Sequence, residues 1–134
     1  MDLTTLTLDE FLCTGNNTIT SADPSTFLAI KTAISSMLGQ KVRNVGPYYI
    51  LYTLNSGIPG DVILLHQGEP VGVYLGEMLA IDPNHQRKDL SVPLILEGVQ
   101  HRPKPTDRKM TPAGKSALTK AWRVANGQIV NPWP

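Results

Sequence analysis

Cysteine is almost absent from this chain of 134 residues. Its single cysteine, Cys13, has no partner within the chain, so an internal disulfide is excluded and a reducing compartment fits best. No apolar run approaches the roughly 18 residues that a membrane-spanning helix needs. The N-terminus also lacks the basic start of a signal peptide, because its first charged residues are Asp2, Asp9 and Glu10. We therefore expect a cytoplasmic protein without a membrane partner.

The chain also carries almost no net charge. Twelve Lys and Arg residues stand against 11 Asp and Glu residues, which gives a formal net charge of +1. A near-neutral chain has no global attraction for nucleic acid or for an acidic membrane, so neither is expected as a partner. No spacing of Cys, His and Asp resembles a metal site, and none is expected. His85 and His101 are interpreted as solvated loop histidines.

The composition is that of a folded domain. Hydrophobic residues make up 41% of the chain and charged residues 17%, which excludes compositional disorder. A chain of this length can bury a substantial core without disulfides or metals. We expect a single domain over residues 1–134, with its core at 22–101 and a C-terminal helix and tail at 110–134.

Three segments carry helix signals. Each begins near a capping residue or a proline that suits a first turn, and each has apolar residues at three- and four-residue spacing. Glycine marks the end of the first and the last of them. The expected helices run from Asp23 to Gly39, with Phe27, Ile30, Ile34 and Met37 on one face, from Ser91 as N-cap to Val99, and from Thr111 to Gly127.

Strand signals fill the middle of the chain. Apolar runs rich in β-branched and aromatic residues lie between clusters of Gly, Pro and Asn, and the Gln67–Pro70 turn joins two of them into a hairpin. Leu3–Leu12 is expected to form a short strand or a docking arm. The expected strands are Tyr48–Leu54, Val62–Leu65, Val71–Leu75 and Glu77–Ile81. These elements predict an α+β fold with a mixed or antiparallel sheet flanked by helices.

The stretch from Leu79 to Val99 carries the strongest functional signal. It reads as an apolar strand, a tight polar loop and the start of a helix. Such a junction offers unpaired backbone N–H groups and the positive end of a helix dipole, which together favour a bound anion. Arg87 and Lys88 in the loop add positive charge.

This stretch resembles the central motif of the GNAT acyltransferase superfamily, where a strand leads into a Gln/Arg-x-x-Gly-x-Gly/Ala loop. Gln86 opens the motif, and Asp89 and Ser91 occupy its two small-residue positions; the resemblance covers about Gly60–Val99. It implies that the strand's backbone pairs with the pantetheine arm of acetyl-CoA and that the loop's amides hold the pyrophosphate. The implied cofactor-binding residues are Leu79, Ala80, Ile81, Gln86, Arg87, Lys88, Asp89, Leu90 and Ser91.

The resemblance implies an N-acyltransferase that moves acetyl from acetyl-CoA to an amine not identified by the sequence. Glu77 is the implied general base; alternatively it is an exposed glutamate or one paired with a basic residue. The alternative function is that of a catalytically inactive GNAT-like binding or interaction protein. Two departures favour it: Asp89 stands where glycine is expected, and the usual C-terminal strands are missing.

Two features bear on assembly. A sheet that ends at Leu79–Ile81 exposes an unpaired edge, which proteins normally cover or pair. Trp133, between two prolines near the chain end, calls for burial in an interface or under a docked tail. The Leu3–Leu12 segment and the Ile129–Trp133 tail are candidates to cover the edge, and a homodimer is the expected alternative.

Overall fold

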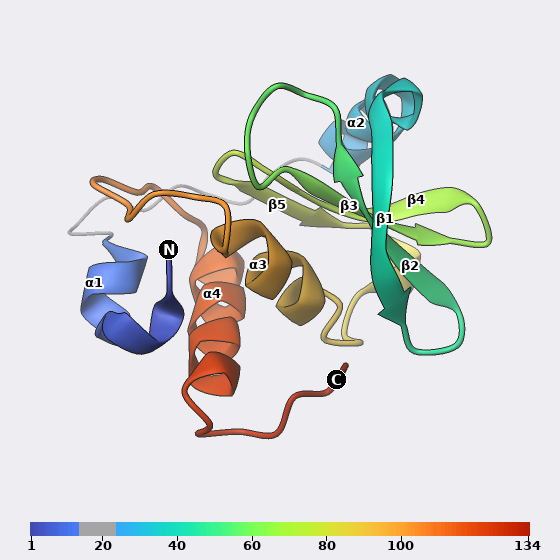
Figure 1. The fold of residues 1–134 in the computed structure, drawn as a ribbon. Coiled ribbons are helices and arrows are strands. Elements are labelled where there is room, and N and C mark those ends of the chain that lie inside the picture. The colour runs from blue at the N-terminus through green and yellow to red at the C-terminus, as the bar shows by residue number, and fades with distance from the viewer. Residues whose placement is uncertain (14–23) are drawn as a thin grey trace.

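The structure is a computed structural model that describes residues 1–13 and 24–134. Over these residues it is an α+β fold built on a five-stranded sheet (Figure 1). The elements in chain order are α1 (Leu8–Leu12), α2 (Pro24–Ile34), β1 (Leu38–Val45), β2 (Tyr49–Leu54), β3 (Val62–His66), β4 (Glu69–Leu75), β5 (Met78–Ile81), α3 (Ser91–Val99) and α4 (Pro112–Ala125).

The sheet is an antiparallel meander. Its strand order is β1-β2-β3-β4-β5, so each strand pairs with its neighbours in sequence, and every pairing is antiparallel. Of the mixed and antiparallel sheets expected, the antiparallel one is found. The hairpin at Gln67–Gly68 is confirmed, as are the strand positions within one or two residues. The two-residue turn Gly76-Glu77 joins β4 to β5 in the same way.

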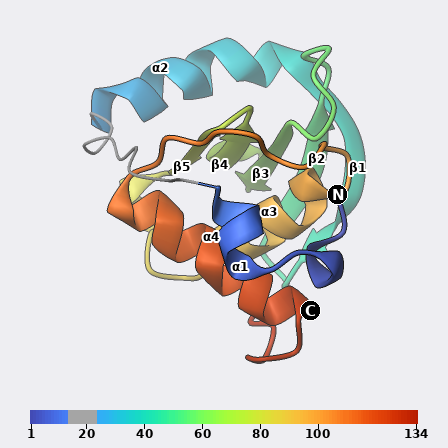
Figure 2. The same cartoon turned by 90° about the vertical axis from the view of Figure 1, so that its left-hand side faces the viewer.

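Helices cover both faces of the sheet. Figures 1 and 2 show α2 on one face, and α3 and α4 with the N-terminal segment on the other. The sheet has a hydrophobic core on each face, because successive side chains along a strand point to opposite faces. On β3, Leu64 joins the larger core under α3 and α4, whereas Ile63 faces Ile34 of α2.

The helix expected over Asp23–Gly39 ends earlier than expected. We expected it to reach Gly39, but α2 stops at Ile34, a short 3-10 turn follows, and Leu38–Val45 forms β1. Gly39 is needed for strand pairing, because a Cβ atom there would lie 2.7 Å from the carbonyl oxygen of Thr53 on β2. The expected N-cap, Asp23, and the side chain of Phe27 lie outside what the structure describes.

The N-terminal segment is helical, so the expected strand is wrong there. Thr7 and Glu10 form a capping box at the start of α1: the Glu10 N–H donates to Thr7 Oγ1 at 3.1 Å, and the Thr7 N–H donates to Glu10 Oε1 at 3.0 Å. Phe11 and Leu12 are buried in the larger core. The segment docks on the sheet's helical layer, next to α4, rather than extending the sheet.

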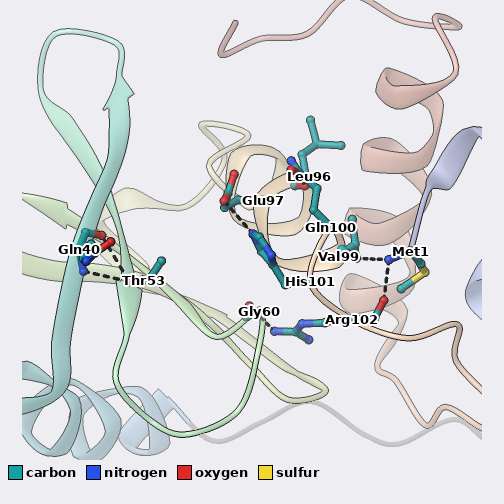
Figure 3. Close-up of polar contacts among 10 residues, drawn as sticks. All are labelled: Met1, Gln40, Thr53, Gly60, Leu96, Glu97, Val99, Gln100, His101 and Arg102. Carbon is teal, nitrogen blue, oxygen red and sulfur yellow. Dashed lines mark hydrogen bonds and ion pairs between the residues drawn. The ribbon is translucent and has the colours of Figure 1, made fainter.

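Arg102, just after α3, ties this layer to the sheet. Its guanidinium donates to the carbonyl oxygen of Gly60 at 2.9 Å (Figure 3). It also donates to the carbonyl oxygens of Tyr74 (3.0 Å) and Gly76, and it lies 3.5 Å from the buried Asp61 carboxylate. The Met1 amino group donates to the carbonyl of Arg102 at 2.6 Å. These bonds fix the position of α3, and with it the loop that precedes α3.

Candidate functional site

β5 is an edge strand, and its outer side is open to a partner. The Asp82 N–H donates to the Val71 carbonyl at 2.8 Å, which sets the phase of the ladder with β4. In an antiparallel ladder alternate residues face the neighbouring strand, so the backbone groups of Leu79 and Ile81 point outward. Only the Ile81 carbonyl has a partner among the described residues, the Gln86 side-chain amide at 3.1 Å. An extended ligand would find free donors and acceptors along this edge.

The loop after β5 has an unusual backbone. A 3-10 turn over Pro83–His85 is followed by two residues at positive φ, Arg87 at +65° and Asp89 at +58°. Positive φ is uncommon for residues with a Cβ atom and is the natural conformation of glycine. Asp89 therefore holds the backbone shape that the motif assigns to glycine. The side chains of Arg87 and Lys88 are exposed.

The start of α3 differs from the expectation. Ser91 is not the N-cap but the first helical residue, because Leu90 before it already has helical backbone angles. No side chain caps the helix, and the Asp89 carbonyl accepts from the Val92 N–H at 3.2 Å. An uncapped start leaves backbone N–H groups for another acceptor.

Asp89 is held by an ion pair that the sequence did not indicate. Lys120 Nζ of α4 donates to Asp89 Oδ1 at 2.6 Å, and each side chain is about two-fifths exposed. The pair joins the loop to the middle of α4 and compensates the charge of the carboxylate. The Asp89 carboxylate alone would repel an anion bound at the loop. The ion pair with Lys120 reduces this repulsion.

Glu77 lies apart from the loop. We expected it on the strand, but it occupies the turn between β4 and β5. The four residues of β5 separate it from the loop, so five steps of roughly 3.3 Å put Glu77 about 17 Å from Asp82. Its carboxylate Oε2 lies 3.4 Å from Nε of Arg108, whose side chain is buried. Glu77 is therefore both exposed and placed beside a basic residue, which leaves a role as general base as a proposal.

The structure brings together a tyrosine and two histidines beside the loop. Tyr49 on β2 and His66 on β3 are cross-strand partners, and their rings lie 5.1 Å apart. The Tyr49 hydroxyl is 2.9 Å from Nδ1 of His85, and the His66 and His85 rings are 4.8 Å apart. His85 is therefore not a solvated loop histidine. The pairing register of β2 with β3 places Tyr49 beside His66, and the 3-10 turn after β5 brings His85 to them.

The surroundings of His85 favour the neutral form of its ring. Burial lowers the pKa of His85, and the neighbouring His66 and Lys88 lower it further, while Asp82 opposes them. A neutral imidazole next to a phenol hydroxyl can accept or pass on a proton near neutral pH. Tyr49 and His85 are thus within hydrogen-bond distance for exchange of a proton, although the motif indicated neither residue.

The C-terminal tail docks beside this cluster. The indole N–H of Trp133 donates to the Lys88 carbonyl at 2.8 Å, and its ring meets Tyr49 edge-on at 5.8 Å. Arg43 on β1 donates to the Trp133 carbonyl at 2.9 Å. Gly46, at φ +60°, makes room, since a Cβ atom there would lie 2.6 Å from the indole ring. Trp133 is thus docked on its own chain, but its contacts are with β1, β2 and the loop, so the expectation that the tail covers the β5 edge is not met.

Comparison of the chain with known protein families, curated proteins and solved structures found no match. Within residues 1–13 and 24–134, no three His, Cys, Asp or Glu side chains are grouped so that they could hold a metal ion. In the same residues, no helix has the length and apolar character to cross a membrane.

Proposed function

We propose that this chain is a GNAT-like, acetyl-CoA-dependent N-acyltransferase of an amine acceptor still to be identified. One observation carries the proposal: the outer edge of β5, which pairs with no other strand of the described residues, leads directly into a loop with glycine-like backbone at Asp89 and onto an uncapped helix start. An extended amide-bearing arm pairs well with a free strand edge, and a diphosphate suits a helix start.

The residues present fit this cofactor. Leu79 and Ile81 offer outward backbone groups for the pantetheine arm, while the loop amides with Arg87 and Lys88 suit the pyrophosphate. Lys120 compensates the one carboxylate at this position, Asp89. Acetyl-CoA, when bound, supplies an activated acyl thioester. The chain itself contributes the alignment of the two reactants, a large part of the rate in such reactions.

Glu77 is the proposed general base. Because it lies at the far end of β5, about 17 Å from the loop, an arm extended along the strand would bring its reactive end toward this carboxylate. Arg108 then acts as a positioning residue, with Nε 3.4 Å from Glu77 Oε2. The exposed carboxylate is free to take a proton from an incoming amine.

A second candidate is a catalytically inactive GNAT-like binding protein. It is favoured by the glycine position being occupied by Asp89, and by the docking of Trp133 on the backbone of Lys88 within the loop. It is also favoured by the order of elements, because within residues 24–134 no strand follows α3. The two candidates share the binding site and differ only in turnover.

Thermal unfolding with acetyl-CoA separates these candidates. A ligand at 100 times its Kd stabilises the native state by about 2.7 kcal/mol, so millimolar acetyl-CoA should raise the Tm by several degrees. Leu79→Pro should abolish the shift because it removes an outward N–H, whereas Leu79→Ala loses the same side-chain packing and should keep it.

Turnover is then measured as free CoA thiol released in the presence of a panel of primary amines. The acyltransferase requires thiol release that falls at least tenfold in Glu77→Gln. A thermal shift without thiol release selects the inactive binding protein. No shift at millimolar acetyl-CoA would rule out both candidates.

A further inference from the structure

A cationic groove runs along the solvent face of α4. Its hollow of about 510 Å³ extends from Pro112 to Ile129 and is lined by one face of the helix. The loop after β5 runs beside this helix (Figure 2), joined to it by the Asp89–Lys120 ion pair. The polar side chains that line the hollow are Lys115, Ser116, Thr119, Lys120 and Arg123.

The groove has no acidic lining residue. This reflects an uneven distribution of charge along the chain: residues 102–134 contain seven Lys and Arg but one Asp, whereas residues 1–81 contain three Lys and Arg against seven Asp and Glu. Arg102 and Arg108 are buried beside carboxylates, and Lys104 pairs with Glu10. Lys109 lies before α4, and on the helix Lys120 is paired with Asp89. In the described part of the chain, Lys115 and Arg123 have no ion-pair partner.

An aliphatic pair stands at one end of the groove. Ile129 lines the hollow and is 37% exposed, and the next residue, Val130, is 89% exposed. Both precede the docked Trp133, which holds the tail in place. A surface that combines cations with exposed aliphatic side chains gains most from a partner that carries both carboxylates and an apolar side chain.

We infer that this groove binds an acidic peptide segment of another protein, with an aliphatic side chain of that segment against Ile129 and Val130. The distance from Lys115 to Arg123 along the helix is about 12 Å, which four residues of extended peptide span. The residues that line the hollow include no aromatic ring on which a nucleic-acid base could stack. The inference does not rest on acyl transfer, because it uses the face of α4 rather than the edge of β5.

The test is fluorescence anisotropy with a fluorescein-labelled 12-residue peptide of Asp and Glu with two central leucines. We expect binding at 50 mM salt that weakens in 300 mM salt. The double variant Lys115→Ala/Arg123→Ala should weaken binding at least tenfold. Its matched control, Lys41→Ala/Lys104→Ala, changes the net charge equally but away from the groove, and should stay within twofold of the unchanged protein.

Two further measurements test which kind of partner the groove binds. The double variant Ile129→Ser/Val130→Ser should weaken the peptide threefold or more, and saturating acetyl-CoA should not displace the peptide. The inference is overturned if the peptide does not bind, or if the control variant weakens it as much as the α4 variant. It is also overturned if a 12-base-pair DNA duplex binds more tightly than the peptide, or if acetyl-CoA displaces the peptide.

Discussion

Among single residues, His85 is the one expected to make stability depend on pH. Burial, His66 and Lys88 all lower the pKa of His85, so the fold disfavours its charged form. The folded-state pKa lies below the unfolded value of about 6.5, and the unfolded chain therefore binds the proton more readily. Stability contributed by neutral His85 is fully present above about pH 6.5 and is lost as pH falls through the folded-state pKa.

The measurement is the Tm at pH 7.5 and at pH 5.5. The unchanged protein should lose more Tm over this range than His85→Gln, which keeps a hydrogen-bonding group near Tyr49 but does not titrate. His101→Gln is the control: His101 is more than half exposed beside Glu97, and its replacement should leave the pH dependence as it was. If His85→Gln retained the full pH dependence, the cause would lie in other groups.

Asp89 is the second residue for which we predict the effect of a substitution. Asp89→Gly should tighten acetyl-CoA binding about threefold to tenfold, because it removes a carboxylate and leaves Lys120 free to meet the phosphates. Global stability should change by less than about 1 kcal/mol, since relief of a positive φ offsets a partly exposed ion pair and the flexibility of glycine. Titration calorimetry measures the affinity for acetyl-CoA, and urea unfolding measures the global stability. Equal or weaker binding by Asp89→Gly would contradict the role of Asp89 beside the phosphates.

Among the elements, α3 packs so closely on the sheet that the side chain allowed at Gly98 is limited in size. Gly98→Ala would normally favour a helix, but here the new Cβ atom would lie 2.8 Å from the Gly60 carbonyl oxygen and 2.8 Å from the Tyr74 ring. The expected loss is about 1–3 kcal/mol in urea unfolding. Gly114→Ala in α4 is the matched control, because its nearest contact is a side-chain oxygen at 3.3 Å; it should be neutral or mildly stabilising. A stabilising Gly98→Ala would mean that α3 packs less closely.

The elements also show what local sequence can and cannot predict. α3, α4 and the central hairpin were predictable because their apolar spacing, caps and turns are local signals. β1 was missed because Leu38–Val45 is a largely polar, irregular edge strand that follows directly on a helix, so its Gly39 resembled a helix stop. α1 was missed because five residues are too few to show helical periodicity.

In the candidate site, too, local sequence predicts some of the features and not others. The Gln86–Ser91 loop was predictable because its residues are contiguous. The cluster of Tyr49, His66 and His85 was not, since the register of β2 with β3 and the approach of the 3-10 turn create it. The Asp89–Lys120 pair likewise joins residues 31 positions apart. Contacts of this kind depend on packing between elements, for which no local pattern exists.

At the scale of the whole molecule, the tail should contribute to stability through Trp133. Its indole bonds Lys88, packs on Tyr49 and fills the space left by Gly46. Because the ring is only partly buried, Trp133→Ala should cost about 1–3 kcal/mol, less than a core tryptophan. Val130→Ala, at an 89% exposed position, should change stability by less than about 0.5 kcal/mol. Equal unfolding curves for the two variants would show that the tail is not docked in solution.

The two sheet edges differ in how open they are to a second copy of the chain. β1 is irregular, with breaks in its register on both sides of Lys41, which hinders further pairing. β5 is regular, and among the described residues only one of its outward backbone groups at Leu79 and Ile81, the Ile81 carbonyl, has a partner. Since Trp133 is satisfied within its own chain, β5 alone supports the expected homodimer. Light scattering at micromolar concentration should therefore give twice the chain mass of 14.6 kDa.

The variants at Leu79 test whether this edge makes the dimer. Leu79→Pro should give a monomer because it removes an outward N–H, whereas Leu79→Ala should remain dimeric. The proposed pantetheine arm needs the same edge, so saturating acetyl-CoA should also dissociate the dimer, by mass action between two occupants of one strand. A monomer at all concentrations would refute the dimer and leave the cofactor site intact. A dimer that persists with acetyl-CoA bound would show that the two partners use different surfaces.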